Sequence, residues 1–207
     1  MNTDWAQHLI SFAHRENIKT IVEFGIGAGT RSLISNFEKV HSIEIVSIGF
    51  NDDEWFKKFE KEFRHFRNWT GEVAFVPKIF TFVEHMMLEK YEPIAGTSKE
   101  VECHFSHVEI IEFLEWAIPR WINRHYDAAF VDPGIHFRGE LVNALFPTID
   151  CIFAHDTRVR NIYGWTSIKV PSNFEEFDLS GETGMGTKVW KRKFVSKNII
   201  LKGESNG

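Results

Sequence analysis

A glycine-rich stretch gives the strongest indication of chemistry in this sequence. Gly25, Gly27 and Gly29 follow the apolar run at residues 20–24 and precede an amphipathic segment. Glycine permits a tight turn with positive φ and lets a ligand approach bare backbone. A turn from a strand into a helix is also where nucleotide-containing ligands commonly bind. No Gly-Lys-Ser/Thr follows the glycines, which excludes a phosphate-binding Walker loop.

Two acidic residues accompany this stretch. Glu23 stands directly before the glycines, a position that suits a site for a positively charged ligand. Glu44 follows Gly25 by 19 positions, in the second apolar run. A carboxylate at the carboxyl end of the second strand can accept hydrogen bonds from both hydroxyls of a ribose. A dinucleotide fingerprint would require glycine or alanine where Thr30 stands, so the pattern favours another nucleoside-containing ligand.

A second block makes the chain resemble a known family. Residues 126–137 read Tyr-Asp-Ala-Ala-Phe-Val-Asp-Pro-Gly-Ile-His-Phe, and residues 152–157 read Ile-Phe-Ala-His-Asp-Thr. With the glycines and Glu44, these blocks are similar to small S-adenosylmethionine-dependent methyltransferases with a Rossmann-like fold. In that family the fourth strand ends in Asp-Gly-x-His and the fifth in His-Asp-Thr. Its members are relatives of catechol-type, metal-dependent O-methyltransferases, and the resemblance covers about residues 18–157.

The resemblance implies a donor site at the glycines. Gly25, Gly27 and Gly29 would shape the S-adenosylmethionine pocket. Glu23 would lie close to the charged end of the donor, and Glu44 would bind its ribose.

The resemblance also implies an acceptor site with a metal ion. Asp132 and Asp156 stand where catechol-type relatives hold a hard divalent cation such as Mg²⁺, which lowers the pKa of the acceptor hydroxyl. Thr157 stands where those relatives place an asparagine ligand. His136 would take the proton, as histidine can near neutral pH, and His155 would orient Asp156. Without a metal, Asp132 could cap the following helix.

The function that the resemblance implies is methyl transfer to a hydroxyl of a small-molecule acceptor. Two alternatives stay open. The strand at residues 72–76 is followed by no acid that could bind adenine, which would suit a nucleoside-binding or regulatory protein of this fold without transfer activity. An NAD(P)-dependent oxidoreductase is disfavoured by Thr30 and by the His-Asp-Thr block.

Composition narrows the classes of partner. The 207 residues are 43% hydrophobic, enough for a real core, and the net charge of −5 argues against nucleic acid as a partner. No apolar run approaches the roughly 18 residues of a membrane span, and the first residues lack the pattern of a signal peptide. We therefore expect a cytoplasmic protein with no membrane contact. Cys103 and Cys151 offer no disulfide framework, and Cys151 is expected to be an inert core thiol.

Apolar runs alternate with amphipathic segments, which is typical of βα units around a parallel sheet. We expect one α/β domain over residues 1–207, a Rossmann-like three-layer sandwich with a mostly parallel sheet and a C-terminal antiparallel hairpin. Helices are expected at 4–16, 31–37, 51–67, 106–117 and 136–146. Strands are expected at 20–24, 40–46, 72–76, 128–131 and 151–154, with the hairpin at 174–179 and 187–191.

Three local features carry further expectations. Residues 78–105 interrupt the pattern and are expected to form an insertion near the binding face, with 82–89 apolar enough to be helical. Pro119 is expected to stop or kink the helix before it. The aromatic residues from Trp55 to Phe66 recur at helical spacing, which predicts core packing. The N-terminal helix and the insertion could form the acceptor pocket or a homodimer interface.

Overall fold

The computed structural model describes residues 4–47, 53–76, 80–84, 99–103, 107–134, 137–158, 164–180 and 185–193. Its helices are α1 (Asp4–Arg15), α2 (Thr30–Asn36), α3 (Glu54–Phe63), α4 (His107–Trp121) and α5 (Arg138–Leu145), with a short 3-10 turn, η1 (Trp165–Ser167). Its strands are β1 (Thr20–Phe24), β2 (Lys39–Ser47), β3 (Trp69–Val76), β4 (Phe80–Glu84), β5 (Lys99–Cys103), β6 (Ala128–Val131), β7 (Cys151–His155), β8 (Phe174–Asp178) and β9 (Thr187–Arg192).

Seven strands form one sheet in the order β3-β2-β1-β6-β7-β9-β8. The pairs β1–β2, β2–β3, β1–β6 and β6–β7 are parallel, while β9 pairs antiparallel with both β7 and β8. The predicted fold class, a mostly parallel sheet with an antiparallel hairpin at its C-terminal edge, is thereby confirmed. The sheet order reverses at β1, whose neighbours β2 and β6 lie on opposite sides.

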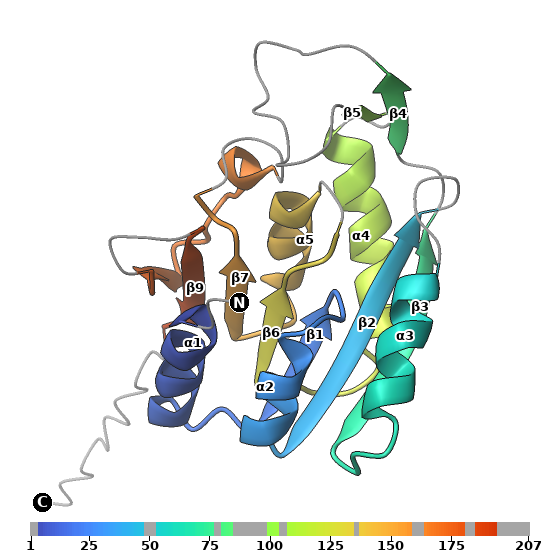
Figure 1. The fold of residues 1–207 in the computed structure, drawn as a ribbon. Coiled ribbons are helices and arrows are strands. Elements are labelled where there is room, and N and C mark those ends of the chain that lie inside the picture. The colour runs from blue at the N-terminus through green and yellow to red at the C-terminus, as the bar shows by residue number, and fades with distance from the viewer. Residues whose placement is uncertain are drawn as a thin grey trace, which may run out of the picture.

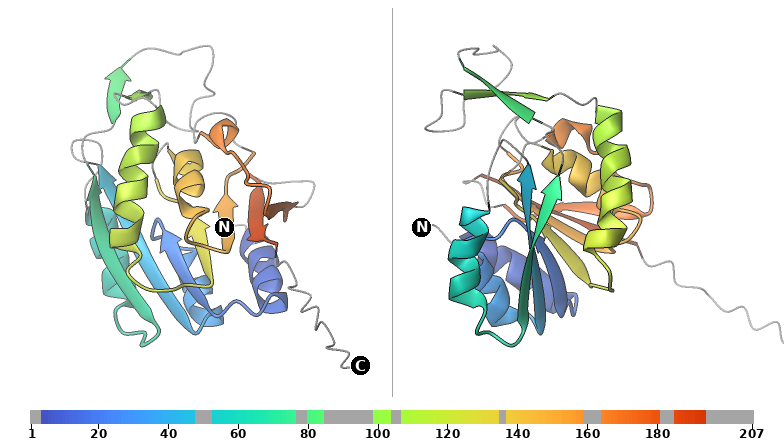
Figure 2. Two further views of the ribbon diagram at one scale, coloured as in Figure 1. Left: turned by 180° about the vertical axis from the view of Figure 1, so that it is seen from behind. Right: turned by 90° about the vertical axis from the view of Figure 1, so that its right-hand side faces the viewer.

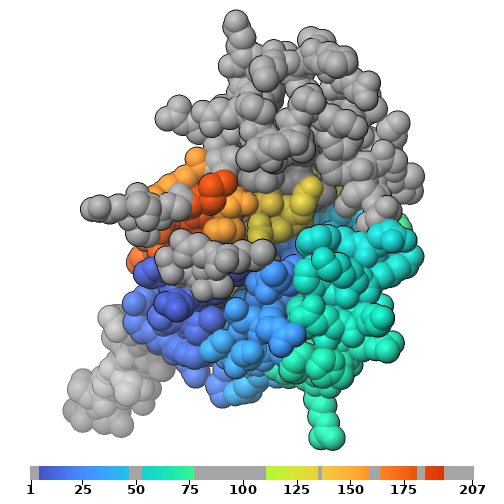
Figure 3. Space-filling view, viewed as in Figure 1, coloured from blue at the N-terminus to red at the C-terminus, as the bar shows by residue number. Residues whose placement is uncertain are grey.

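Helices cover both faces of the sheet and make three layers. In the right-hand view of Figure 2, α1, α2 and α3 lie on one face, and α4 and α5 lie on the other. The first three helices lie side by side across their face of the molecule (Figure 3). The carboxyl ends of the parallel strands all point to one end of the molecule (Figure 1), so residues that follow these strands gather there.

The central strands are apolar on both faces, as buried parallel strands must be. Along β6, Ala128 and Phe130 pack in the cluster beneath α1, α2 and α3, whereas Ala129 and Val131 pack beneath α4 and α5. Successive side chains of a strand point to opposite faces, so one short apolar run supplies both cores.

Helix α4 contradicts the expectation that Pro119 ends it. The helix continues to Trp121, and the N–H of Ile122 still donates to the Ile118 carbonyl at 2.8 Å. Leu114 and Ile118 are buried against the sheet, and this packing outweighs the backbone hydrogen bond that proline cannot make. Within the described segments, no helix combines the length and the apolar character that crossing a bilayer requires.

The insertion begins as a strand rather than a helix. β4 and β5 pair antiparallel, with Phe82 opposite Val101. The helix expected at 82–89 is therefore wrong for 82–84, since residues 80–83 are aromatic or β-branched, which favours a strand once a partner is available. This hairpin lies at the same end of the molecule as the carboxyl ends of the parallel strands (Figure 1), as expected for an insertion near the binding face.

Helix α3 follows its predicted pattern with one exception. Phe56, Phe59 and Phe63 are buried beneath it, as the helical spacing predicted. Trp55 is 50% exposed and does not belong to the core. Its position one residue before Phe56 turns the indole off the buried face, toward the loop after β1.

Asp127 ties together the amino ends of β1 and β6. Its Oδ2 accepts hydrogen bonds from the N–H groups of Lys19 and Thr20, both at 2.9 Å, and from the Thr20 hydroxyl at 3.0 Å. Burial by itself would raise the pKa of Asp127, but these hydrogen bonds lower it below the ordinary 3.8.

We predict that Asp127→Asn lowers the free energy of unfolding by about 1–3 kcal/mol at pH 7, because the amide is a weaker acceptor facing the same donors. The difference should begin to shrink as pH falls below about 3.8, where the carboxyl of the unfolded wild type takes up a proton before that of the folded protein does. Urea denaturation at pH 7 and pH 3 measures both effects. Asp53→Asn, which removes an exposed ion pair with Lys57, is the control and should cost less than about 1 kcal/mol. Equal losses in the two variants would contradict the prediction.

Candidate functional site

Gly25 marks the point where the chain leaves the sheet after β1. Its N–H donates to the Ile43 carbonyl of β2, and the preceding Phe24 carbonyl accepts from the N–H of Asp132, each at 2.9 Å. The backbone of Gly25 has a φ of +95°, and a Cβ there would lie 2.4 Å from the Asp132 carbonyl oxygen. Only glycine fits this position. It lies at the reversal of strand order, where open α/β sheets bind ligands.

The carboxyl group of Glu23 lies beneath the glycine loop and is 1% exposed. It accepts hydrogen bonds from the hydroxyls of Thr30 at 2.9 Å and Ser42 at 2.5 Å. The Thr30 hydroxyl in turn accepts the N–H of Gly27 at 3.0 Å. Burial raises the pKa of Glu23 to about 8. Glu23 therefore supports the loop from inside the protein, and its effect on a ligand would pass through the loop.

Glu44 holds the same loop from β2. Its Oε2 accepts the N–H of Ile26 at 2.9 Å, and the Ile26 carbonyl accepts the indole N–H of Trp55 at 2.6 Å. The Glu44 side chain is nearly buried, and this burial raises its pKa to about 7. The strand continues past Glu44 to Ser47, so Glu44 lies level with the loop rather than at the last residue of the strand.

The other two glycines differ in what surrounds them. Among the described residues, a Cβ at Gly27 would meet no heavy atom within 4 Å, so the space beside Gly27 is open. A Cβ at Gly29 would lie 2.7 Å from Cζ2 of Trp5. Trp5 belongs to α1 and stacks on Phe130 of β6, with ring centroids 5.1 Å apart and an angle of 8° between the rings. The loop is therefore open at Gly27 and covered at Gly29.

Asp132 and Asp156 come together because β6 and β7 are adjacent parallel strands. Nη1 of Arg138 lies 2.7 Å from Oδ1 of Asp132 and 3.3 Å from Oδ2 of Asp156. Arg138 opens α5, and its side chain is 5% exposed. Burial raises the pKa of Asp132 above its ordinary 3.8, and the positive charge of Arg138 opposes that shift. One guanidinium thus bridges the two predicted catalytic carboxylates.

His155 contacts Asp156 from another side, as the sequence predicted. Its Nε2 lies 3.3 Å from Oδ1 of Asp156, and its Nδ1 lies 3.1 Å from the Thr187 hydroxyl of β9. The ring also packs on Trp5 at a centroid distance of 5.0 Å. Asp156 has a φ of 60°, a left-handed conformation that aspartate tolerates better than most residues. These contacts fix the direction of its carboxylate.

The residues around this pair do not fit the divalent cation that the resemblance implies. Such a cation needs oxygen ligands at about 2.0–2.6 Å, but the Arg138 guanidinium already engages an oxygen of each carboxylate. The backbone N–H of Thr157, the third predicted ligand, donates to the Gly186 carbonyl of the closing hairpin at 3.2 Å. Its hydroxyl is buried and makes no hydrogen bond with the described residues, so the case against the cation rests on Arg138. Across the described residues, no group of three or more His, Cys, Asp or Glu side chains is arranged to hold a metal.

His136, the predicted base, lies outside the described residues, which stop at Gly134 and resume at Phe137. Its role stays a prediction from the sequence. Cys151 is buried in β7, and this burial raises the pKa of its thiol, in keeping with an inert core residue.

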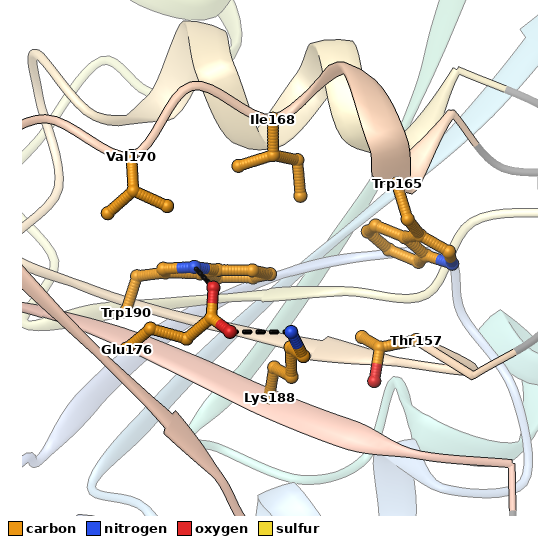
Figure 4. A pocket seen from close by; sticks show the side chains of 7 residues that line it. All are labelled: Thr157, Trp165, Ile168, Val170, Glu176, Lys188 and Trp190. Carbon is orange, nitrogen blue, oxygen red and sulfur yellow. Dashed lines mark hydrogen bonds and ion pairs between the residues drawn. The ribbon is translucent and has the colours of Figure 1, made fainter.

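A cavity of about 110 Å³ adjoins the end of β7. It is lined by Thr157, Trp165, Ile168, Val170, Glu176, Lys188 and Trp190. In Figure 4, Ile168 and Val170 lie over the flat face of Trp190. On the other side Glu176 accepts hydrogen bonds from Lys188 and from the indole N–H of Trp190, so the cavity has both apolar and polar walls. The indole N–H of Trp165 donates to the Asp156 carbonyl at 2.9 Å, which links this wall to the carboxylate pair.

Three side chains of the site escaped the sequence analysis: Trp5, Trp55 and Arg138. The two tryptophans fall on amphipathic helices, where periodicity alone assigns aromatic residues to the core. For Arg138, the sequence contained a signal that indicates nearby carboxylates. This residue opens a helix, where the helix dipole disfavours a cation, so its position calls for nearby carboxylates.

Comparison with known proteins gives a likeness of fold. No protein-family model and no curated protein matches the sequence. The solved structure of yhhF from Escherichia coli, assigned as a methyltransferase, is similar with a TM-score of 0.51 and 13% identity, over 93% of this chain and 87% of that one. A protein from Haemophilus influenzae assigned as a methylase has a TM-score of 0.45 and 13% identity, over 91% of this chain and 88% of that one. A methyltransferase from Geobacter sulfurreducens has a TM-score of 0.47 and 11% identity, over 91% of this chain and 78% of that one.

The sheet order and the likeness to the first of these structures define the class of fold. It is the Rossmann-like fold of methyltransferases, as the sequence predicted. At 13% identity this likeness concerns the fold alone. The narrower resemblance to the Asp-Gly-x-His family stays a prediction.

We predict a pH dependence of stability that originates in Glu23. Its pKa is raised from 4.5 to about 8 in the folded protein, so between these values the folded state binds more protons than the unfolded state. The free energy of unfolding should therefore fall as pH rises from about 4.5 to about 8. Glu23→Gln stays neutral and can still bond both hydroxyls, so it should remove much of this decline.

Urea denaturation at several pH values between 4.5 and 8 tests the prediction, since these limits are the ordinary and raised pKa of Glu23. The pKa of Glu44 is also raised, to about 7, so the stability of Glu23→Gln should still fall with pH but less steeply than that of the wild type. Glu38→Gln alters only an exposed pair with Lys19 and should keep the wild-type slope. Identical slopes in the wild type and Glu23→Gln would show that Glu23 is not the source.

Proposed function

We propose that this protein is an S-adenosylmethionine-dependent methyltransferase that methylates a hydroxyl group of a small molecule. The observation that carries the proposal is the open space beside Gly27, at the reversal of strand order. The Glu44 carboxyl supports this loop from β2, and the carboxylates of Asp132 and Asp156 follow the two strands on the other side.

The donor side rests on the glycine loop. A bound nucleoside can approach the backbone at Gly27, where no side chain intervenes. Gly25 and Gly29 set the shape of the loop through their contacts with Asp132 and Trp5. Glu44 lies next to Ile26, within the loop, where it could accept ribose hydroxyls with the carboxylate oxygen not bonded to that residue. The exposed indole of Trp55 offers a flat face to the adenine ring.

The acceptor side rests on the carboxylate pair. In the proposed reaction, an acceptor oxygen attacks the methyl carbon of the sulfonium in line. The new C–O bond forms as the S–CH₃ bond breaks, with its electron pair passing to sulfur. The acceptor proton goes to the imidazole of His136, and Asp132 and Asp156 orient the hydroxyl. Alignment of donor and acceptor supplies most of the rate acceleration in such a displacement.

A second candidate is a nucleoside-binding or regulatory protein that performs no transfer. The observation that favours it is the burial of Glu44, which is 4% exposed and already accepts the N–H of Ile26. Purified protein that retains an S-adenosyl compound but consumes it with no acceptor would support this alternative.

We predict micromolar binding of S-adenosylhomocysteine by the wild type and at least about tenfold weaker binding by Gly27→Ala, which places a methyl group in the open space. Isothermal titration calorimetry measures both. The alanine Cβ contacts none of the described residues, so the melting temperature should stay unchanged while affinity falls.

Gly134→Ala is the matched control for this substitution. A Cβ at Gly134 also meets no atom of the described segments within 4 Å, but it lies after β6 rather than in the donor loop. It should bind S-adenosylhomocysteine as the wild type does. Failure of the wild type to bind at millimolar ligand would overturn the proposed donor site, and NADP titrated in parallel would reveal a dinucleotide site instead.

We predict that Asp156→Asn removes turnover and leaves the affinity for S-adenosylhomocysteine within about threefold of the wild type. Asparagine tolerates the left-handed backbone at this position, so the loss would report the missing charge. Asp178→Asn, which removes an exposed pair with Arg158, is the control and should keep its activity. Turnover by Asp156→Asn at the wild-type rate would exclude a catalytic role for Asp156.

A further inference from the structure

Arg138 is held at the candidate site by more contacts than an ordinary ion pair provides. Its Nε donates to the Pro133 carbonyl at 2.7 Å, while Nη1 lies 2.7 Å from Asp132 and 3.3 Å from Asp156. Its side chain is 5% exposed, against 29% for Asp132 and 19% for Asp156. The guanidinium therefore lies deeper than the carboxylates, and the carboxylates keep their access to solvent.

The position of Arg138 in the chain indicates that the carboxylates hold it there. It is the first residue of α5, where the helix dipole is unfavourable to a cation. Two carboxylates side by side would also repel each other without a counter-charge. A guanidinium carries a delocalised positive charge and several N–H donors, so it can serve as this counter-charge.

A divalent cation and this guanidinium compete for the same oxygens. A metal between the two carboxylates would have to displace Nη1, which approaches an oxygen of each. Arg138 is anchored by its bond to Pro133 and enclosed by the protein, so displacing it would leave a buried charge without its partners.

We propose that Arg138 is the resident cation of this carboxylate pair: its guanidinium takes the place of a divalent metal ion and positions Asp132 and Asp156 for the acceptor. The methyl transfer proposed above is then independent of metal. That activity rests on the proposed function, whereas the competition between Arg138 and a metal does not.

Binding of Mn²⁺ alone, followed by electron paramagnetic resonance of the free ion, tests the competition directly. The wild type should bind no stoichiometric Mn²⁺ at about 1 mM, whereas Arg138→Met should bind it at least about tenfold more tightly. This gain should vanish in Arg138→Met/Asp156→Asn. Arg158→Met is the matched control, because it removes an exposed ion pair with Asp178, and it should gain no affinity for Mn²⁺.

Two results would overturn the competition. One is Mn²⁺ binding by the wild type that Asp132→Asn abolishes. The other is a folded Arg138→Met protein with no gain in Mn²⁺ affinity. If the methionine variant does not fold, Arg138→Gln keeps hydrogen-bond donors without the charge and serves the same test, and the wild-type measurement stands without either variant.

Turnover separates this proposal from the proposed function. With S-adenosylmethionine and an accepted substrate, the rate should stay within about twofold after chelation by EDTA and after addition of Mg²⁺. Loss on chelation with recovery in Mg²⁺ would overturn the role of Arg138 and leave the methyltransferase proposal intact. No turnover under any condition would overturn the methyltransferase proposal and leave the Mn²⁺ result to decide on Arg138.

A positioning role also predicts that a substitution of Arg138 lowers kcat more than it lowers the affinity for the donor. Arg138→Lys keeps one positive charge but cannot bridge two carboxylates with the same geometry. Its kcat should fall at least about tenfold, while its affinity for S-adenosylhomocysteine stays within about threefold. Equal weakening of kcat and donor affinity would indicate a general structural defect and contradict the positioning role.

Discussion

The backbone of Gly25 passes the backbone of Asp132 so closely that no side chain fits between them, and the arrangement of the candidate site depends on this contact. It brings the loop after β1 against the turn after β6. The proposed donor and acceptor sides therefore share one short edge of the sheet. In a reaction whose rate depends on alignment, a fixed distance between two binding surfaces is itself a catalytic contribution. The two backbones can approach this closely because Gly25 adopts a positive φ.

Three carboxyl groups are partly or fully buried around this contact. Burial raises the pKa values of Glu23, Glu44 and Asp132 together. The protein compensates them in different ways. Hydroxyl and backbone donors satisfy the two glutamates without introducing charge. Asp132 alone receives a full counter-charge, from Arg138. This division separates carboxyls that hold a loop from carboxylates that can act on a substrate.

The sequence predicted a mostly parallel sheet with a C-terminal hairpin and a glycine loop after the first strand, because short apolar runs and helical spacing report burial directly. It could not predict contacts that arise only when distant segments meet. Arg138 can bridge to Asp156 only because β6 and β7 pair as adjacent parallel strands. Trp55 can donate to the Ile26 carbonyl only because α3 packs beside the loop after β1. The helix expected at 82–89 is wrong at 82–84 for the same reason, since these residues form β4 by pairing with β5, which is distant in the sequence.

The stacking of Trp5 also bears on the order in which the chain can fold. Helix α1 leaves the ribosome before β6 and β7, yet the indole of Trp5 packs on Phe130 and His155, which are made more than 120 residues later. Contacts between such distant residues form late, because the intervening chain must first lose its freedom. A nascent chain that ends before β6 therefore leaves Trp5 unburied. During synthesis, this exposed indole is a natural point of contact for chaperones.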